Sequence, residues 1–256
     1  MSNELVTKQT QIPATLSGVQ DLFSYDEVET KDLKIPKLLL MQAGSKFVKD
    51  DDIAKAGDMV NSISGEILGT CREKDLKPIE FTPIYMYKTW VKNEVLPGGQ
   101  KKYAGTEAVT PENTDLPWEY SEFDEESQTT KSYTRTKNIN FYVILKKDFD
   151  NPVALPYVLS FRGSSSKAAN IITSHFAECK FAKAAGTFRI PMDRTFILSG
   201  KIEKNDKGSF YVYSVREGVK TSESVMQQAV NWYKQVAKSD HSKVHTDEVS
   251  AESESF

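Results

Sequence analysis

The segment that decides the fold is Lys131–Lys146, which reads KSYTRTKNINFYVILK. Its odd positions begin with basic and aromatic residues and end with apolar ones. Because side chains alternate across a β-strand, one face of a strand formed here changes in character along its length. We therefore predict one long strand whose second half lies in a hydrophobic core and whose first half forms a binding surface.

Other segments also have the composition of strands. Phe81–Val91 is rich in aromatic and β-branched residues, and Leu155–Phe161 is short and apolar. Turn residues at Ser64-Gly65 and at Asn205–Gly208 each separate two such runs, which predicts two hairpins.

Two segments have the spacing of helices. Apolar residues at helical intervals follow Ser164–Ser166 and stop at Ala185-Gly186, and a second such run follows Ser222. The strands and helices do not alternate regularly, so a doubly wound sheet is excluded. The predicted fold is mainly β: an OB-like, partly open barrel with long loops, an embedded helix and a C-terminal helix. An unspecified α+β sheet is the alternative.

The predicted organisation is a flexible N-terminal segment (1–30), an OB-like nucleic-acid-binding domain (31–220), a C-terminal helix (221–239) and a disordered acidic tail (240–256). Residues 93–130 form a long polar insertion in the domain. An insertion of this length in a compact domain is usually functional or disordered.

Charge is segregated along the chain. The net charge is −3, but residues 1–30 and 240–256 each carry −4, and residues 107–126 contain eight acids and no base. Without that acidic stretch, residues 31–239 carry +13. A basic body with acidic ends indicates a surface for a polyanion, together with a tail that competes for it or is bound by a partner. For the tail, the alternative interpretation is a contribution to solubility alone.

Composition limits the setting. Two cysteines, Cys71 and Cys179, form no disulfide framework, the first residues lack the features of a signal peptide, and no apolar run is long enough to span a membrane. These features predict a cytoplasmic protein without a membrane partner.

The predicted nucleic-acid-binding residues are lysines and arginines interleaved with aromatic residues. They lie on the two long strands and on the loop after the first of these strands. Basic groups meet phosphates and aromatic faces stack on unpaired bases. Core packing is the alternative for any single aromatic. Arg162 and Lys167 flank a helix start that could hold a phosphate, with ordinary capping as the alternative. The full set is Tyr85, Tyr87, Lys88, Trp90, Lys92, Lys101, Lys102, Tyr103, Lys131, Tyr133, Arg135, Lys137, Arg162 and Lys167.

No catalytic constellation, metal site or cofactor site is predicted. His175 and Cys179 are four residues apart on a predicted helix, but no second pair of ligands accompanies them, and Cys179 falls in the apolar stripe. Asp50–Asp52 is interpreted as a solvated loop.

The chain resembles a single-stranded DNA-binding protein of a tailed bacteriophage. The residues that carry the resemblance are a basic, aromatic-rich β domain and the acidic C-terminal segment Glu252–Phe256. Looser likeness to phage-encoded proteins extends over Ile35–Gln42, Gly57–Gly69, Phe81–Trp90 and Leu155–Phe176. The resemblance implies DNA rather than RNA as ligand, and a tail that mimics DNA and recruits replication partners.

The first functional hypothesis is therefore a non-enzymatic protein that coats single-stranded DNA in phage replication or recombination, in the host cytoplasm. Its predicted partners are single-stranded DNA and, through the tail, replication or recombination proteins; homo-oligomerisation is left open. The alternatives are a phage structural or host-interaction protein that docks a basic partner, and a nucleic-acid enzyme with an unrecognised site. The predicted partner-binding residues are Asp247, Glu248, Glu252, Glu254 and Phe256.

Overall fold

A computed structural model of the protein describes residues 34–125, 128–206 and 208–238. The chain divides into two compact units, Met1–Leu33 and Lys34–Phe256, and every described residue belongs to the second. The predicted segment 1–30 and tail 240–256 lie outside the described residues. In chain order the elements are β1 (Lys37–Leu40), α1 (Lys46–Lys49), β2 (Asp58–Asn61), β3 (Ile67–Thr70), η4 (Glu73–Asp75), β4 (Ile79–Val95), β5 (Lys101–Ala108), β6 (Glu119–Asp124), β7 (Thr129–Leu145), η5 (Lys146–Asp148), β8 (Tyr157–Phe161), η6 (Gly163–Ser165), α2 (Ser166–Ala184), η7 (Pro191–Asp193), β9 (Arg194–Asn205), β10 (Gly208–Lys220) and α3 (Glu223–Val236).

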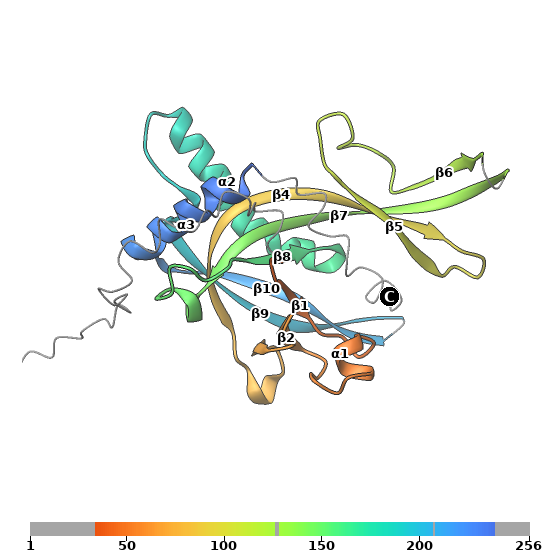
Figure 1. Cartoon of the computed structure of the whole chain (residues 1–256), viewed down its shortest axis with the longest axis horizontal. Coiled ribbons are helices and arrows are strands. Elements are labelled where there is room, and N and C mark those ends of the chain that lie inside the picture. Colours follow the sequence, from red (N-terminus) through yellow and green to blue (C-terminus); the bar gives the residue numbers. More distant parts are fainter. Residues whose placement is uncertain (1–33, 126–127, 207, 239–256) are drawn as a thin grey trace, which may run out of the picture. The chain divides into compact units, whose positions relative to one another are not determined.

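The described residues form one mixed, ten-stranded sheet with few helices (Figure 1). Its main path runs β10-β9-β4-β7-β8-β1-β2-β3, while β5 pairs with β4 and β6 pairs with β7. Strand β1 runs parallel to β8, and the other pairs are antiparallel. The prediction of a mainly β protein is therefore confirmed. The sheet is not closed, so an OB-like barrel is not confirmed.

The sheet curls until β10, at one end of its path, approaches β1. The side-chain amide of Gln42, which follows β1, donates to the carbonyl of Tyr211 in β10 and accepts from its N–H, both at 2.9 Å. The hydroxyl of Tyr213 in β10 donates to the carbonyl of Leu38 in β1 at 2.9 Å. These contacts join β10 to the β1 region through side chains, without a continuous ladder of backbone hydrogen bonds.

The two faces of the sheet carry two hydrophobic cores, as strand β7 shows. Phe141, Val143 and Leu145 lie in an inner core, inside the curl, together with residues of the other main-path strands. Tyr142 and Ile144 point the other way, into an outer core. Because side chains alternate along a strand, a continuous apolar run at the end of β7 places a core on both of its faces.

The two long helices cover these cores, and both were predicted. Helix α2 contributes Ala169 and Ile172 to the inner core. Helix α3 contributes Ala229 and Val236 to the outer core, and it packs against β4. The prediction that Ala185-Gly186 ends the first helix is also confirmed, since α2 stops at Ala184.

Strands β4 and β7 are each 17 residues long and continue beyond the cores as a two-stranded arm, drawn in yellow and green in Figure 1. Strand β5 pairs with the outer edge of β4, and β6 with the outer edge of β7. We call this four-stranded region, Lys88–Val95 with β5, β6 and Thr129–Lys137, the ribbon. About half of the polar insertion 93–130 is thus part of the sheet.

Candidate nucleic-acid interface

One face of the ribbon gathers cationic and aromatic side chains from three strands, and we call it the cation–aromatic face. The register pairs Trp90 with Lys137, Lys92 with Arg135, and Tyr120 with Tyr133. Cross-strand partners point to the same face of a sheet. The strand periodicity inferred from sequence therefore brings Trp90, Lys92, Tyr133, Arg135 and Lys137 together, and adds Tyr120 from β6.

Tyr120 and Tyr133 form the centre of this face. Their rings are stacked, with centroids 5.4 Å apart and an interplanar angle of 21°. The guanidinium of Arg135 lies 3.9 Å from the centroid of Tyr120, and Nζ of Lys92 lies 4.0 Å from that of Tyr133. Each ring is thus in contact with a cation, the arrangement of a cation–π pair.

Trp90 lies at the end of the same face but is covered. Trp90 is only 6% exposed, and its Nε1 donates to the carbonyl of Asn113 at 2.9 Å. Nζ of Lys137 lies 4.7 Å from the indole ring and donates to the carbonyl of Thr114 at 2.9 Å. The loop 109–118 between β5 and β6 therefore covers Trp90, which is not free to receive a base in this conformation.

Acidic residues of the insertion pair with bases of the ribbon. Glu122 lies 2.9 Å from Nζ of Lys92, and Asp124 forms an ion pair with Lys131. Partial burial lowers the pKa of Lys92, but the hydrogen bonds and charge interactions with Glu122 and Tyr120 together outweigh burial, and the pKa is raised. The hydrogen bond to Asp124 likewise raises the pKa of Lys131. The sequence-based charge of +13 left residues 107–126 out. In the structure, acids of this stretch neutralise part of that basic surface.

Some buried polar atoms of the ribbon have no hydrogen-bond partner. On the cation–aromatic face Nε of Arg135 is such an atom. On the opposite face, Asn93 lies across from Thr134 and Thr89 across from Asn138 in the strand register. The buried atoms there without a hydrogen-bond partner are Oδ1 of Asn93, Oγ1 of Thr134 and Oδ1 of Asn138. Unsatisfied buried polar groups are costly, and a bound ligand can satisfy them.

The remaining predicted residues of this region divide into buried and exposed groups. Tyr87 belongs to the outer core, and Tyr85 packs against it, with its ring 5.8 Å from that of Tyr233 in α3. Tyr103 is half-buried, and its hydroxyl lies 3.0 Å from Oγ1 of Thr106. Lys88, Lys101 and Lys102 are exposed on the ribbon.

Arg162 and Lys167 lie at the start of α2 and do not belong to the ribbon. Both are exposed, and Ser165, the residue before the helix, makes no side-chain capping bond. Its hydroxyl instead accepts from the N–H of Tyr213 at 3.1 Å. Ordinary side-chain capping by this serine is therefore absent, and its hydroxyl serves to attach the helix start to β10.

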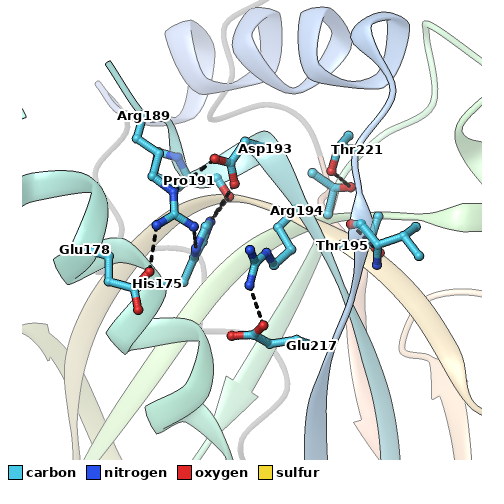
Figure 2. Close-up of polar contacts among 11 residues, drawn as sticks. His175, Glu178, Arg189, Pro191, Asp193, Arg194, Thr195, Glu217 and Thr221 are labelled. Atoms are coloured by element: carbon cyan, nitrogen blue, oxygen red, sulfur yellow. Dashed lines mark hydrogen bonds and ion pairs between the residues drawn. The ribbon is translucent and has the colours of Figure 1, made fainter. Parts of the chain in front are cut away.

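The end of α2 is fixed by a polar cluster (Figure 2). Arg189 donates to Glu178 at 2.8 Å and to Asp193 at 3.2 Å, and Nε2 of His175 lies 3.1 Å from the carbonyl oxygen of Pro191. Nη2 of Arg189 lies 3.5 Å from Nδ1 of His175. A cation thus faces one imidazole nitrogen, while the Pro191 carbonyl and Oδ1 of Asp193, at 3.2 Å, face the other, so protein groups hold both nitrogens of His175.

The cluster supports an exposed aromatic surface. Phe188, next to Arg189, is 91% exposed, and Phe181, in the last turns of α2, is 71% exposed. Lys180 and Lys183 are exposed beside them. We call Lys180, Phe181, Lys183 and Ala185–Phe188 the α2 tip.

Sequence reasoning missed Tyr120, Glu122 and Asp124 because the insertion was treated as a loop. A charge signal was present: Glu119–Asp124 is acidic where Lys131–Arg135 is basic, as expected of two adjacent strands. Phe181 and Phe188 gave no comparable signal, since exposure depends on tertiary packing.

Other classes of site find no support in the described part of the chain. Over residues 34–125, 128–206 and 208–238, no three His, Cys, Asp or Glu side chains gather where they could hold a metal ion. Among the helices there, none has the length and apolar character needed to cross a bilayer. The predicted partner-binding residues Asp247, Glu248, Glu252, Glu254 and Phe256 lie outside the part of the chain that can be placed.

Comparison with known proteins gives one match. The model of the family described as Pam3 phage gp34-like protein matches residues 7–242. No curated protein and no solved structure matches the chain. Since the match extends over nearly the whole sequence, the chain belongs to the Pam3 phage gp34-like family.

Proposed function

We propose that this protein binds single-stranded DNA through the cation–aromatic face of the ribbon, and coats unpaired strands during phage DNA replication or recombination. The observation that carries the proposal is the stacked pair Tyr120–Tyr133 with Arg135 and Lys92 over its rings, while a donor nearby, Nε of Arg135, has no hydrogen-bond partner. Phosphate oxygens and base carbonyls are acceptors of the kind this donor needs.

The charge of the face supports the same ligand. Lys88, Lys92, Lys102, Lys131, Arg135 and Lys137 point to it by register, against the acids Glu94, Glu107, Glu122 and Asp124. A net positive charge remains after internal pairing. A single strand that neutralises several of these cations releases counterions, so its affinity falls with salt.

Membership of a phage family supports the phage setting, and the resemblance noted from sequence is the reason to name DNA before RNA. In this proposal the curled sheet acts as an OB-like body, and the ribbon is an extension of it. The protein is non-enzymatic and acts in the host cytoplasm, and its acidic tail recruits replication or recombination proteins.

The test is a fluorescence titration with oligo-dT and with a duplex of the same length, at several salt concentrations. We expect tighter binding to oligo-dT, with a log–log salt slope of roughly −0.7 per phosphate contact. Replacement of the exposed Lys88 and Lys102 by Ala should weaken binding and flatten the slope. The matched control replaces Lys204 and Lys234, which are exposed away from the ribbon. Equal affinity for duplex, or equal losses in both double variants, would contradict the proposal.

The α2 tip favours a second candidate function, that of a phage structural or host-interaction protein. Phe181 and Phe188 are 71% and 91% exposed, and exposed apolar patches are typical of surfaces that bind a partner. The partner we would test first is a second copy of the chain. Sedimentation velocity should show concentration-dependent association that disappears in the double variant Phe181→Ser, Phe188→Ser. A wild-type protein that stays monomeric at all concentrations would argue against this role.

A further inference from the structure

We infer that Trp90 and Lys137 form a covered binding site for one unpaired nucleotide, and that the loop 109–118 occupies this site in the free protein. The inference rests on the proposed function and adds to it a specific subsite and the segment that competes for it. The predicted ligand group is a nucleobase stacked on the indole ring, with its phosphate at the ammonium group of Lys137.

The groups that the loop places in the site resemble those of a nucleotide. The carbonyl oxygen of Asn113 accepts from Nε1 of Trp90, and the carbonyl oxygen of Thr114 accepts from Nζ of Lys137, both at 2.9 Å. Sugar and phosphate oxygens of a nucleotide are acceptors for the same two donors. Nζ of Lys137 lies 4.7 Å from the indole centroid, which is close enough to bind the phosphate of a nucleotide whose base stacks on the ring.

The loop also resembles the ligand in charge. It contains Glu112 and Asp115 and no base, and it joins Glu107 of β5 to Glu119 of β6. Both of these bordering acids are exposed. An acidic segment seated on a basic and aromatic surface lowers the affinity of that surface for a polyanion, because the polyanion must displace it.

The loop is anchored at its ends and held lightly between them. The N–H of Val109 donates to the carbonyl of Lys88 at 3.0 Å, and the N–H of Arg135 donates to that of Trp118 at 2.6 Å. Between these anchors, over the described residues, the loop is joined to the ribbon by the hydrogen bonds from Trp90 and Lys137 and by one from Nδ2 of Asn113 to the carbonyl of Ala108 in β5. Displacement of residues 110–117 would therefore break few contacts and would leave β5 and β6 in place.

Asn113 gives the loop its shape. Its Oδ1 accepts from the N–H of Thr110 at 2.7 Å, and its Nδ2 donates to the carbonyl of Ala108 at 2.9 Å. These bonds hold the turn that presents the Asn113 carbonyl to Trp90. The change Asn113→Ala removes both bonds without altering a residue that would contact the nucleotide.

The experiment compares wild type, Asn113→Ala, Trp90→Phe and a control, Asn170→Ala, which alters an exposed asparagine of α2. Oligo-dT is titrated into each protein, with affinity read by fluorescence anisotropy of a labelled oligonucleotide and stacking read by quenching of tryptophan emission. We expect Asn113→Ala to bind about fivefold more tightly than wild type, the effect of losing one or two competing hydrogen bonds. Asn170→Ala should match wild type, and Trp90→Phe should lose most of the quenching.

The outcomes separate the two proposals. If wild type and Asn113→Ala both fail to bind oligo-dT, the proposed function fails and this inference fails with it. If all proteins bind with equal affinity and Trp90→Phe keeps full quenching, binding stands and only the covered site is overturned. If Asn113→Ala proves unstable in a thermal melt, the quenching of Trp90→Phe relative to wild type decides alone.

Discussion

At the scale of single residues, the lysine and arginine side chains of the ribbon contact aromatic rings and carboxylates of the same chain. An exposed cation–π contact contributes about 0.5–1 kcal/mol, and a surface ion pair about 0–1 kcal/mol. The side chains of Lys92 and Glu122 are 27% and 49% exposed, so their pair belongs to this weak class. A phosphate can replace such a partner at small cost, while the contacts hold the rings in place until then.

Trp90 gives a prediction at this scale. Because its residue is 6% exposed and its N–H is bonded, Trp90→Ala should destabilise the protein by roughly 3 kcal/mol through loss of packing. Trp90→Phe keeps most of the apolar area and should cost much less. Chemical denaturation of both variants measures this difference. An unchanged midpoint for Trp90→Ala would mean that the loop does not cover the indole in solution.

At the scale of elements, the extent to which sequence predicted the structure depends on apolar pattern. β7 and β8 were located correctly because each contains a run of apolar, β-branched and aromatic residues, and α2 and α3 because apolar residues recur at helical spacing. β5 and β6 were not, because KKYAGTEA and EYSEFD contain few apolar residues. They are edge strands that pair with β4 and β7, and sequence alone does not show which long strands extend far enough to pair with them.

The same limit applies to the candidate interface. Alternation along the predicted Lys131–Lys146 strand placed Tyr133, Arg135 and Lys137 on one face, and the register of β4 and β7 adds Trp90 and Lys92 to it. Alternation did not reveal that loop 109–118 covers Trp90, because a contact between the indole and a loop carbonyl more than twenty residues away leaves no periodic signal.

Glu80 gives a prediction about how elements are joined. From β4, its carboxylate accepts from Lys146 in η5 at 2.6 Å and from Thr195 in β9 at 2.9 Å. Burial raises the pKa of Glu80, but these hydrogen bonds and the charge of Lys146 outweigh burial, and the pKa lies below its ordinary value of 4.5. A lowered folded-state pKa means stability that is present above the ordinary pKa and is lost as pH falls through the folded-state value.

We therefore expect Glu80→Gln to lower the free energy of unfolding by about 1 kcal/mol at pH 7, a modest figure because Lys146 is 66% exposed. The difference from wild type should shrink as pH falls below 4.5. Urea denaturation at pH 7 and at several acidic values measures it, with Glu73→Gln, at an exposed position of η4, as control. A deficit that stays constant with pH would mean that the carboxylate charge is not involved.

At the scale of the whole molecule, the proposed function implies that acidic segments compete with nucleic acid for the same cations. Inside the sheet, β6 and the loop 109–118 do so at fixed positions on the ribbon. At the end of the chain, residues 240–256 add five acids and one lysine, a net −4. Two acidic segments on one basic body predict that affinity for a single strand is set by competition as well as by contact.

Removal of residues 240–256 tests the second of these segments. The truncation follows Lys238 and keeps the described contacts of α3, so the melting temperature should stay nearly unchanged. It raises the net charge by 4, and binding to oligo-dT should tighten most at low salt, where the Debye length reaches ~30 Å. Phe256→Ala keeps the acids, so it should leave this affinity alone but abolish capture of a replication partner, for which Phe256 would be the buried anchor. Titrations of all three proteins at low and physiological salt measure the competition. Equal affinities at both salts would show that the tail does not compete for the ribbon, and partner capture that survives Phe256→Ala would remove its recruiting role.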